Sequence, residues 1–134
     1  MRAQAKELLR WGYGVLFALV GANHFMHTEF YLSIMPPYLP SHLALVYASG
    51  VCEIALGIAL LFRSTQRFAA RGMIALIVVV TPANLHMAVH AELYTRFSPT
   101  ALWIRLLLQV VLIAWAYWYT RPAELHESAN IRSP

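Results

Sequence analysis

The chain has 134 residues, of which 60% are hydrophobic and only 12% are charged. Soluble domains average about 45–50% apolar and about 25% charged residues, and a water-soluble domain this short could not bury so much apolar surface. Such a composition also excludes a disordered chain, which needs low hydrophobicity. We therefore expect residues 1–134 to form a single domain in a lipid bilayer.

The charge balance is basic, with ten Lys and Arg against six Asp and Glu, a net charge of +4. The basic residues stand beside apolar segments and form no cluster interleaved with aromatic residues, so a nucleic-acid partner is not predicted. They indicate membrane topology instead. The single cysteine, Cys52, excludes an internal disulfide.

Four continuous apolar segments predict membrane-spanning helices at residues 11–27, 43–62, 71–90 and 101–119. Each is close to the length of about 17–25 residues that a crossing helix needs. None alternates polar and apolar residues as the strands of a membrane barrel do. The expected fold is an all-α bundle of four transmembrane helices. Residues 1–22 also resemble a secretory signal, but we interpret them as part of a retained helix.

The positive charges predict the orientation of this bundle. Only Arg96 and Arg105 fall on one side of the predicted membrane. Cytoplasmic segments carry an excess of Lys and Arg, so both termini are expected in the cytoplasm and the protein in a bacterial inner membrane. The eight residues on the other side are Arg2, Lys6, Arg10, Arg63, Arg67, Arg71, Arg121 and Arg132.

Polar residues inside the predicted spans are the candidates for function. Ionisable side chains at membrane depth usually face the bundle interior or a wet cavity. The helical rise of about 1.5 Å per residue places them in the outer half of the bilayer, with Glu53 about 15 Å deep. We predict an outward-facing polar pocket with Glu53 as its catalytic candidate. The predicted ligand-binding residues are His24, Asn84, His86 and Arg105.

Glu53 is the one carboxylate within the four segments. At that depth it is either protonated or paired with a positive group. Arg105 is the cation at comparable depth, and His24, Asn84 or His86 are the alternative partners. Glu53 could then lock helices together, donate a proton in a reaction, or bind the head group of a ligand.

A metal site is a further alternative. Histidines one helical turn apart, joined by a carboxylate from another helix, hold zinc or iron in some bundles. The candidate ligands are His24, His27, Glu53, His86 and His90. No HExxH motif, glycine-rich phosphate loop or GxSxG motif is present, and the chain contains no Asp. These absences exclude most hydrolase and nucleotide-driven schemes.

Two short motifs are related by an offset of 63 residues. Residues 27–31 and 90–94 both read His-x-Glu-apolar-Tyr, and both follow an odd-numbered predicted span. One interpretation is that the chain consists of two parallel two-helix repeats; chance similarity is the other.

Several blocks together resemble the DoxX-like family of small four-helix membrane proteins. They are Gly21-Ala-Asn-His24-Phe, the proline-rich stretch at 31–40, Ser49-Gly-Val-Cys-Glu53-Ile-Ala-Leu-Gly57 and Pro82-Ala-Asn84-Leu-His-Met87-Ala. The resemblance covers residues 12–119 and implies a compact four-helix bundle. Some members of that family are subunits of quinone-linked membrane oxidoreductases, and many have no assigned activity. The family-like positions in this chain are His24, Pro36, Pro40, Glu53, Pro82 and Asn84.

The predicted function is that of an inner-membrane protein whose polar pocket binds a quinone or a similar amphiphile within a redox complex. Quinone carbonyls need hydrogen-bond donors, and quinone reduction needs a proton source such as Glu53. The expected partners are the bilayer, this amphiphile, and partner membrane subunits or further copies of the chain. The alternatives are a non-catalytic assembly or scaffold subunit and a metal-dependent membrane enzyme.

Overall fold

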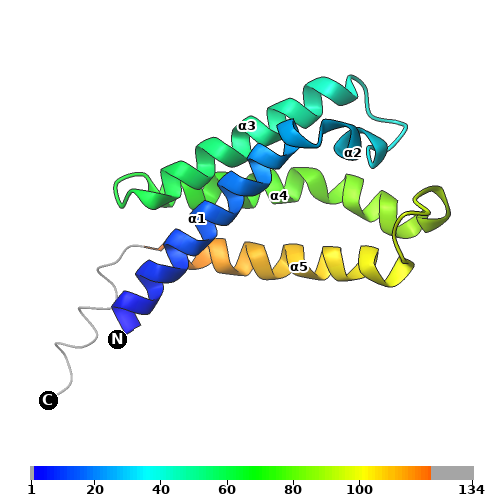
Figure 1. Cartoon of the computed structure of the whole chain (residues 1–134). Coiled ribbons are helices and arrows are strands. Elements are labelled where there is room, and N and C mark those ends of the chain that lie inside the picture. The colour runs from blue at the N-terminus through cyan, green and yellow to red at the C-terminus, as the bar shows by residue number, and fades with distance from the viewer. Residues whose placement is uncertain (1, 122–134) are drawn as a thin grey trace, which may run out of the picture.

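The computed structural model describes residues 2–121, and the predicted tail charge Arg132 lies outside them. The described chain is helical and contains no strand. Four long helices run back and forth along the molecule, and the short helix α2 and the 3₁₀ helix η1 lie in two of their connections (Figure 1). The elements are α1 (Arg2–Met26), α2 (Thr28–Ser33), α3 (His42–Leu61), α4 (Gln66–Val89), η1 (Ala91–Leu93) and α5 (Pro99–Trp118).

Three of these helices are long and apolar enough to cross a membrane, namely α3, α4 and α5. Much of their surface is apolar and outward-facing, and only 11% of the most apolar part of α5 is buried. Helices that are apolar all round belong in a protein core or a bilayer. The structure therefore supports a membrane-embedded protein.

Helix α1 differs from the sequence expectation. It begins at Arg2, nine residues before the predicted span, so the charged residues that precede the apolar segment are helical as well. Arg10 near one end of its apolar part, and Asn23 and His24 near the other, lower the hydropathy of that part, and α1 is not among the three candidate spans. A fourth span thus stays a prediction.

Helices α1 and α3 approach each other closely because glycines face one another. A Cβ atom on Gly14 would lie 2.7 Å from the carbonyl oxygen of Gly57, and one on Gly21 would lie 2.6 Å from that of Gly50. At both positions the backbone of one helix lies directly against the backbone of the other. Small residues at such an interface allow the tight packing that holds membrane helices together.

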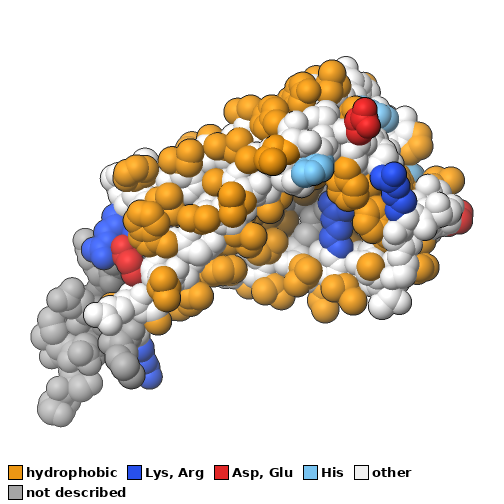
Figure 2. All heavy atoms as spheres, viewed as in Figure 1, with side chains coloured by type: hydrophobic (Ala, Val, Ile, Leu, Met, Phe, Trp, Pro, Cys, Tyr) orange, Lys and Arg blue, Asp and Glu red, His pale blue; other side chains and the backbone are white. Residues whose placement is uncertain are grey.

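The two ends of the bundle differ in composition. Both termini of the described chain and the α3–α4 connection share one end; α2 and η1 lie at the other (Figure 1). At the terminal end, buried Arg10 donates hydrogen bonds to the carbonyls of Leu60 and Leu61, which end α3. A cation there also interacts favourably with the helix dipole. Lys and Arg side chains appear near both ends of the visible face, and the surface between them is mainly hydrophobic (Figure 2).

The main apolar core lies in the half of the bundle nearer the termini. It is built around Tyr13, Leu60, Met73 and Tyr119, all of which are fully buried. The hydroxyl of Tyr13 donates to the carbonyl of Leu112 at 2.9 Å. This core joins α1 to α5 at that end of the molecule.

Candidate functional site

The close α1–α3 packing brings His24 and Glu53 together. A Cβ atom on Gly21 would lie 2.9 Å from Cβ of Glu53, and one on Gly50 would lie 2.9 Å from Cβ of His24. Nδ1 of His24 is 3.4 Å from Oε2 of Glu53. Of the partners that the sequence predicts for Glu53, His24 is thus the one within ion-pair distance.

The orientation of the His24 ring follows from its hydrogen bond. Nδ1 lies 2.9 Å from the carbonyl oxygen of Val20. A carbonyl oxygen can only accept, so Nδ1 carries a proton and donates it. The ring also stacks on Tyr31 of α2, with centroids 3.8 Å apart and planes 19° apart. Backbone and aromatic contacts therefore fix the imidazole beside Glu53.

Glu53 is incompletely satisfied by its surroundings. Its side chain is 15% exposed, and its Oε2 atom is buried without a hydrogen-bond partner in residues 2–121. A buried carboxyl oxygen without a hydrogen bond costs free energy. An oxygen of this kind is available to a ligand that can share a proton with it.

Arg105 of α5 supplies a positive charge to the same region. It interacts electrostatically with His24, Glu53 and Tyr31. Its one hydrogen bond within the described chain runs from Nη1 to the sulfur of Met87, at 3.7 Å, and a thioether is a weak acceptor. The guanidinium therefore has N–H groups that can still donate hydrogen bonds to a ligand. We call His24, Tyr31, Glu53, Met87 and Arg105 the Glu53 cluster.

The contribution of Tyr31 is not evident from the sequence pattern. Asn23 donates from Nδ2 to the hydroxyl of Tyr31 at 2.9 Å, and His27 donates from Nδ1 to Oδ1 of Asn23 at 2.7 Å. This network ties α2 to the end of α1 and holds Tyr31 against His24. The signal in the sequence is the His-x-Glu-apolar-Tyr motif, which carries both His27 and Tyr31.

His86 and His90 have contacts of their own, separate from the Glu53 cluster. The hydroxyl of Tyr94 is 3.3 Å from Nδ1 of His86, and the rings of His86 and His90 stack at 4.4 Å. Tyr38 contacts His86 edge-on, with centroids 5.1 Å apart. No hydrogen bond or ion pair among the described residues joins this group to Glu53. Asn84 is buried in α4, one turn from Met87 and on the same helix face.

The five predicted metal ligands do not gather in one place. Glu53 contacts His24, His86 contacts His90, and His27 contacts Asn23. Within the described part of the chain, no group of three or more His, Cys, Asp or Glu side chains could hold a metal ion. The histidines contact different neighbouring residues, so they do not converge on one point where a metal ion could bind.

The three prolines among the family-like positions, Pro36, Pro40 and Pro82, lie outside the Glu53 cluster and differ in burial. Pro36 is fully buried, and Nε2 of His42 donates to its carbonyl at 3.1 Å. Helix α4 continues through Pro82. Next to it, the hydroxyl of Thr81 donates to the carbonyl of Ile77 at 2.7 Å. Pro40 is exposed in the α2–α3 connection.

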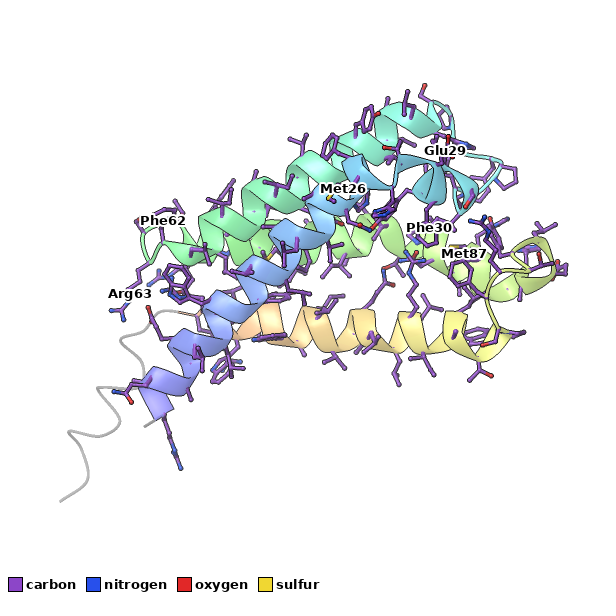
Figure 3. All side chains as sticks on the ribbon, in the orientation of Figure 1. Met26, Glu29, Phe30, Phe62, Arg63 and Met87 are labelled. Atoms are coloured by element: carbon purple, nitrogen blue, oxygen red, sulfur yellow. The ribbon has the colours of Figure 1, made fainter. Side chains whose placement is uncertain are left out.

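The Glu53 cluster lies where α1 and α5 separate. Contacts between these helices occur toward the termini, where Tyr13 stacks on Trp115 and the hydroxyl of Tyr119 donates to the carbonyl of Lys6. Toward α2 the two helices diverge (Figure 1). The surface between them is hollowed, and a histidine and a basic side chain lie beside the hollow (Figure 2). Met26, Phe30 and Met87 lie toward this end, and Phe62 and Arg63 lie at the opposite end (Figure 3).

The model of the family described as "Domain of unknown function (DUF8561)" matches residues 13–120. The chain belongs to this family. The matched residues include the whole Glu53 cluster, the last three apolar segments, and all but the first two residues of the first one. No curated protein and no solved structure matches it. The resemblance to the DoxX-like family stays a prediction.

Proposed function

We propose that this chain is a multi-pass inner-membrane protein in which α1, α3, α4 and α5 all cross the bilayer. The hydropathy of the last three helices supports this proposal, as does the tight glycine packing of α1 on α3. The excess of Lys and Arg at the terminal end favours that end as the cytoplasmic one. The Glu53 cluster then lies in the half of the bundle away from the cytoplasm.

The proposed ligand of the Glu53 cluster is a quinone or a similar amphiphile. The observation that carries this proposal is the buried Oε2 of Glu53, which has no hydrogen-bond partner within the described residues and lies near Arg105. The guanidinium of Arg105 can donate hydrogen bonds to a ligand. A quinone head group presents carbonyl oxygens that accept hydrogen bonds. Its apolar tail needs a route into lipid, and the hollowed surface between α1 and α5 supports one (Figure 2).

The residues of the cluster have distinct proposed roles. Arg105 donates hydrogen bonds to a carbonyl oxygen of the head group. Glu53 exchanges a proton with the head group, and His24 positions the Glu53 carboxyl group. The chain acts within a redox complex, in which a partner membrane subunit supplies the electrons. A quinone bound at this site contributes the redox chemistry.

Binding of a short-tailed quinone to the detergent-purified protein tests this proposal. We expect saturable binding of decylubiquinone in titration calorimetry, weakened at least tenfold in Glu53→Leu and Arg105→Leu. Cys52→Ser is the matched control, because Cys52 adjoins Glu53 in sequence but is exposed on the outside of α3. Equal affinity in all four proteins would show partition into detergent and favour a non-catalytic assembly subunit.

A further inference from the structure

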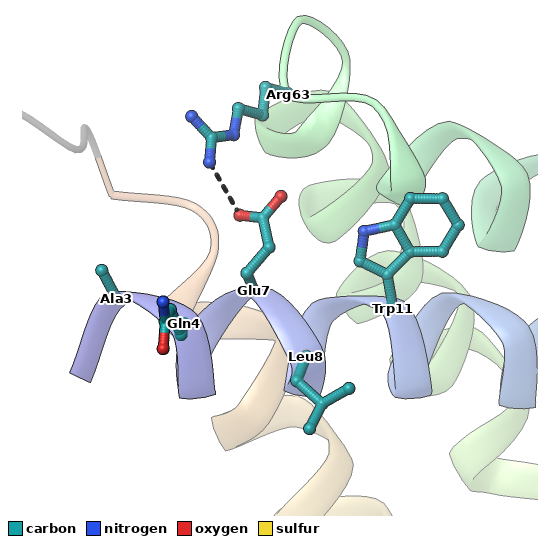
Figure 4. Close-up of a pocket in the computed structure, with 6 residues that line it drawn as sticks. All are labelled: Ala3, Gln4, Glu7, Leu8, Trp11 and Arg63. Atoms are coloured by element: carbon teal, nitrogen blue, oxygen red, sulfur yellow. Dashed lines mark hydrogen bonds and ion pairs between the residues drawn. The ribbon is translucent and has the colours of Figure 1, made fainter. Parts of the chain in front are cut away.

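A pocket of about 400 Å³ lies at the terminal end of the molecule, remote from the Glu53 cluster. It is formed between the first turns of α1 and the α3–α4 connection. Glu7 and Trp11 extend from one side of α1 toward this connection, whereas Leu8 points away from it (Figure 4). Its volume is within the range of small-ligand sites. The lining residues are Ala3, Gln4, Glu7, Leu8, Trp11 and Arg63.

Opposite charges stand side by side in this pocket. Nη2 of Arg63 donates to Oε2 of Glu7 at 3.1 Å. The other carboxylate oxygen of Glu7 accepts from Arg10, which is buried and bonded to the end of α3. Glu7 is thereby fixed in place, whereas the Arg63 side chain is 79% exposed. Arg63 is therefore free to turn toward a second anion while Glu7 stays in position.

Apolar surface begins at the same level. Trp11 lines the pocket and is 48% exposed, and the neighbouring Leu8 is 74% exposed. Tryptophan is enriched at membrane–water interfaces, where its ring lies among lipid head groups. The apolar part of α1 starts at Trp11. A carboxylate, a guanidinium and an indole thus converge at the depth expected for head groups.

We propose that this pocket binds a zwitterionic phospholipid of the phosphatidylethanolamine type. Its ammonium group donates hydrogen bonds to Glu7, and its phosphate accepts them from Arg63. Trp11 and Leu8 contact the glycerol and the first methylenes of the acyl chains. The fixed carboxylate disfavours a lipid whose head group is only anionic, because like charges would meet. The proposal requires membrane embedding but not an amphiphile at the Glu53 cluster.

Native mass spectrometry of the detergent-purified chain tests this proposal. The probes are dioleoyl-phosphatidylethanolamine and dioleoyl-phosphatidylglycerol, offered at equal concentration. We expect one phosphatidylethanolamine to bind at least fivefold more tightly than phosphatidylglycerol. Glu7→Gln should reduce this preference to near unity, because the group that selects the ammonium is removed.

Arg63→Gln leaves the Glu7–Arg10 contact in place, so this variant keeps the fold and carries the test even if Glu7→Gln unfolds. It should weaken phosphatidylethanolamine binding at least fivefold. Arg67→Gln is the matched control, because Arg67 is exposed near the same connection but does not line the pocket. Equal binding of the two lipids by the wild-type chain would overturn the proposal. An equal loss in Arg63→Gln and Arg67→Gln would overturn it as well.

Discussion

Glu53 is the residue at which structural and chemical roles can be separated. Glu53→Gln keeps the shape and some hydrogen bonding of the side chain but removes its titratable proton. If Glu53 exchanges a proton with a quinone, this variant should fold with a melting temperature close to that of the wild type. It should nevertheless lose most quinone reduction, measured with the complete redox complex. Unchanged turnover in Glu53→Gln would leave Glu53 with a purely structural role.

Arg105 has a different expected signature. Arg105→Lys keeps the positive charge but loses the forked donor geometry of the guanidinium. We expect its quinone affinity to fall about tenfold, which corresponds to about 1.4 kcal/mol, with little change in thermal stability. Titration calorimetry of both proteins checks this. An Arg105→Lys protein that binds quinone as tightly as the wild type would show that charge alone is sufficient.

Glu7 predicts a pH dependence of stability outside the membrane. Its hydrogen bond from Arg63 lowers the pKa of this carboxyl group below the ordinary value of 4.5. A depressed folded-state pKa contributes stability above about pH 4.5, and this contribution is lost as the pH falls through the folded-state pKa. The melting temperatures of the wild type and Arg63→Gln should therefore differ slightly at pH 7. They should converge as the pH falls through the lowered folded-state pKa of Glu7, and a gap that widens in acid would contradict the pairing.

At the scale of elements, the α1–α3 glycine interface determines both packing and the position of the site. Gly21→Ala places a Cβ atom 2.6 Å from the carbonyl oxygen of Gly50, so the helices must separate. Overpacking of this kind costs about 1–3 kcal/mol. Gly12→Ala is the matched control, because a Cβ atom on Gly12 meets nothing within 4 Å. Thermal unfolding should show a lower melting temperature for Gly21→Ala only. Quinone binding should also weaken in this variant, because His24 and Glu53 move apart.

The helices themselves could largely be predicted from the sequence, because their apolar segments are long and continuous. The start of α1 could not, since residues 2–10 mix charged and apolar side chains and lie outside the continuous apolar segment. Their helix is stabilised by the Glu7–Arg10 pair and by contacts with α3. Helix α2 could not be predicted either, because it is short and lies within a proline-rich connection. Hydropathy alone does not decide whether α1 spans the membrane.

Three members of the Glu53 cluster, His24, Glu53 and Arg105, could be predicted from the sequence, but their contacts could not. Tyr31 and Met87 were not among the predicted site residues. Depth along the helices places His24, Glu53 and Arg105 at similar levels, but it does not show which helix faces which. The glycine pairs that align His24 with Glu53 become interpretable only when α1 and α3 are seen together. His86 lies at a similar depth and yet faces Tyr94, because neighbouring positions on α4 point in different directions.

At the scale of the whole molecule, the unequal charge of the two ends predicts the topology. Reporter fusions after Arg67 and after Arg121 should both give a cytoplasmic readout, because seven of the Lys and Arg residues within the described chain lie toward that end. A fusion within the α4–α5 connection should give a periplasmic readout. A periplasmic readout after Arg67 would invert the bundle and place the Glu53 cluster in the cytoplasmic half.

Photoaffinity labelling tests the proposed quinone site most directly. A quinone with a photoreactive group beside its ring, activated in membranes that contain the protein, should label peptides bearing His24, Tyr31, Glu53 or Arg105. Excess decylubiquinone should compete this labelling away, and Glu53→Leu should abolish it. Labelling confined to outward-facing residues of α3 and α5, unchanged by the competitor or by Glu53→Leu, would contradict a quinone site between α1 and α5.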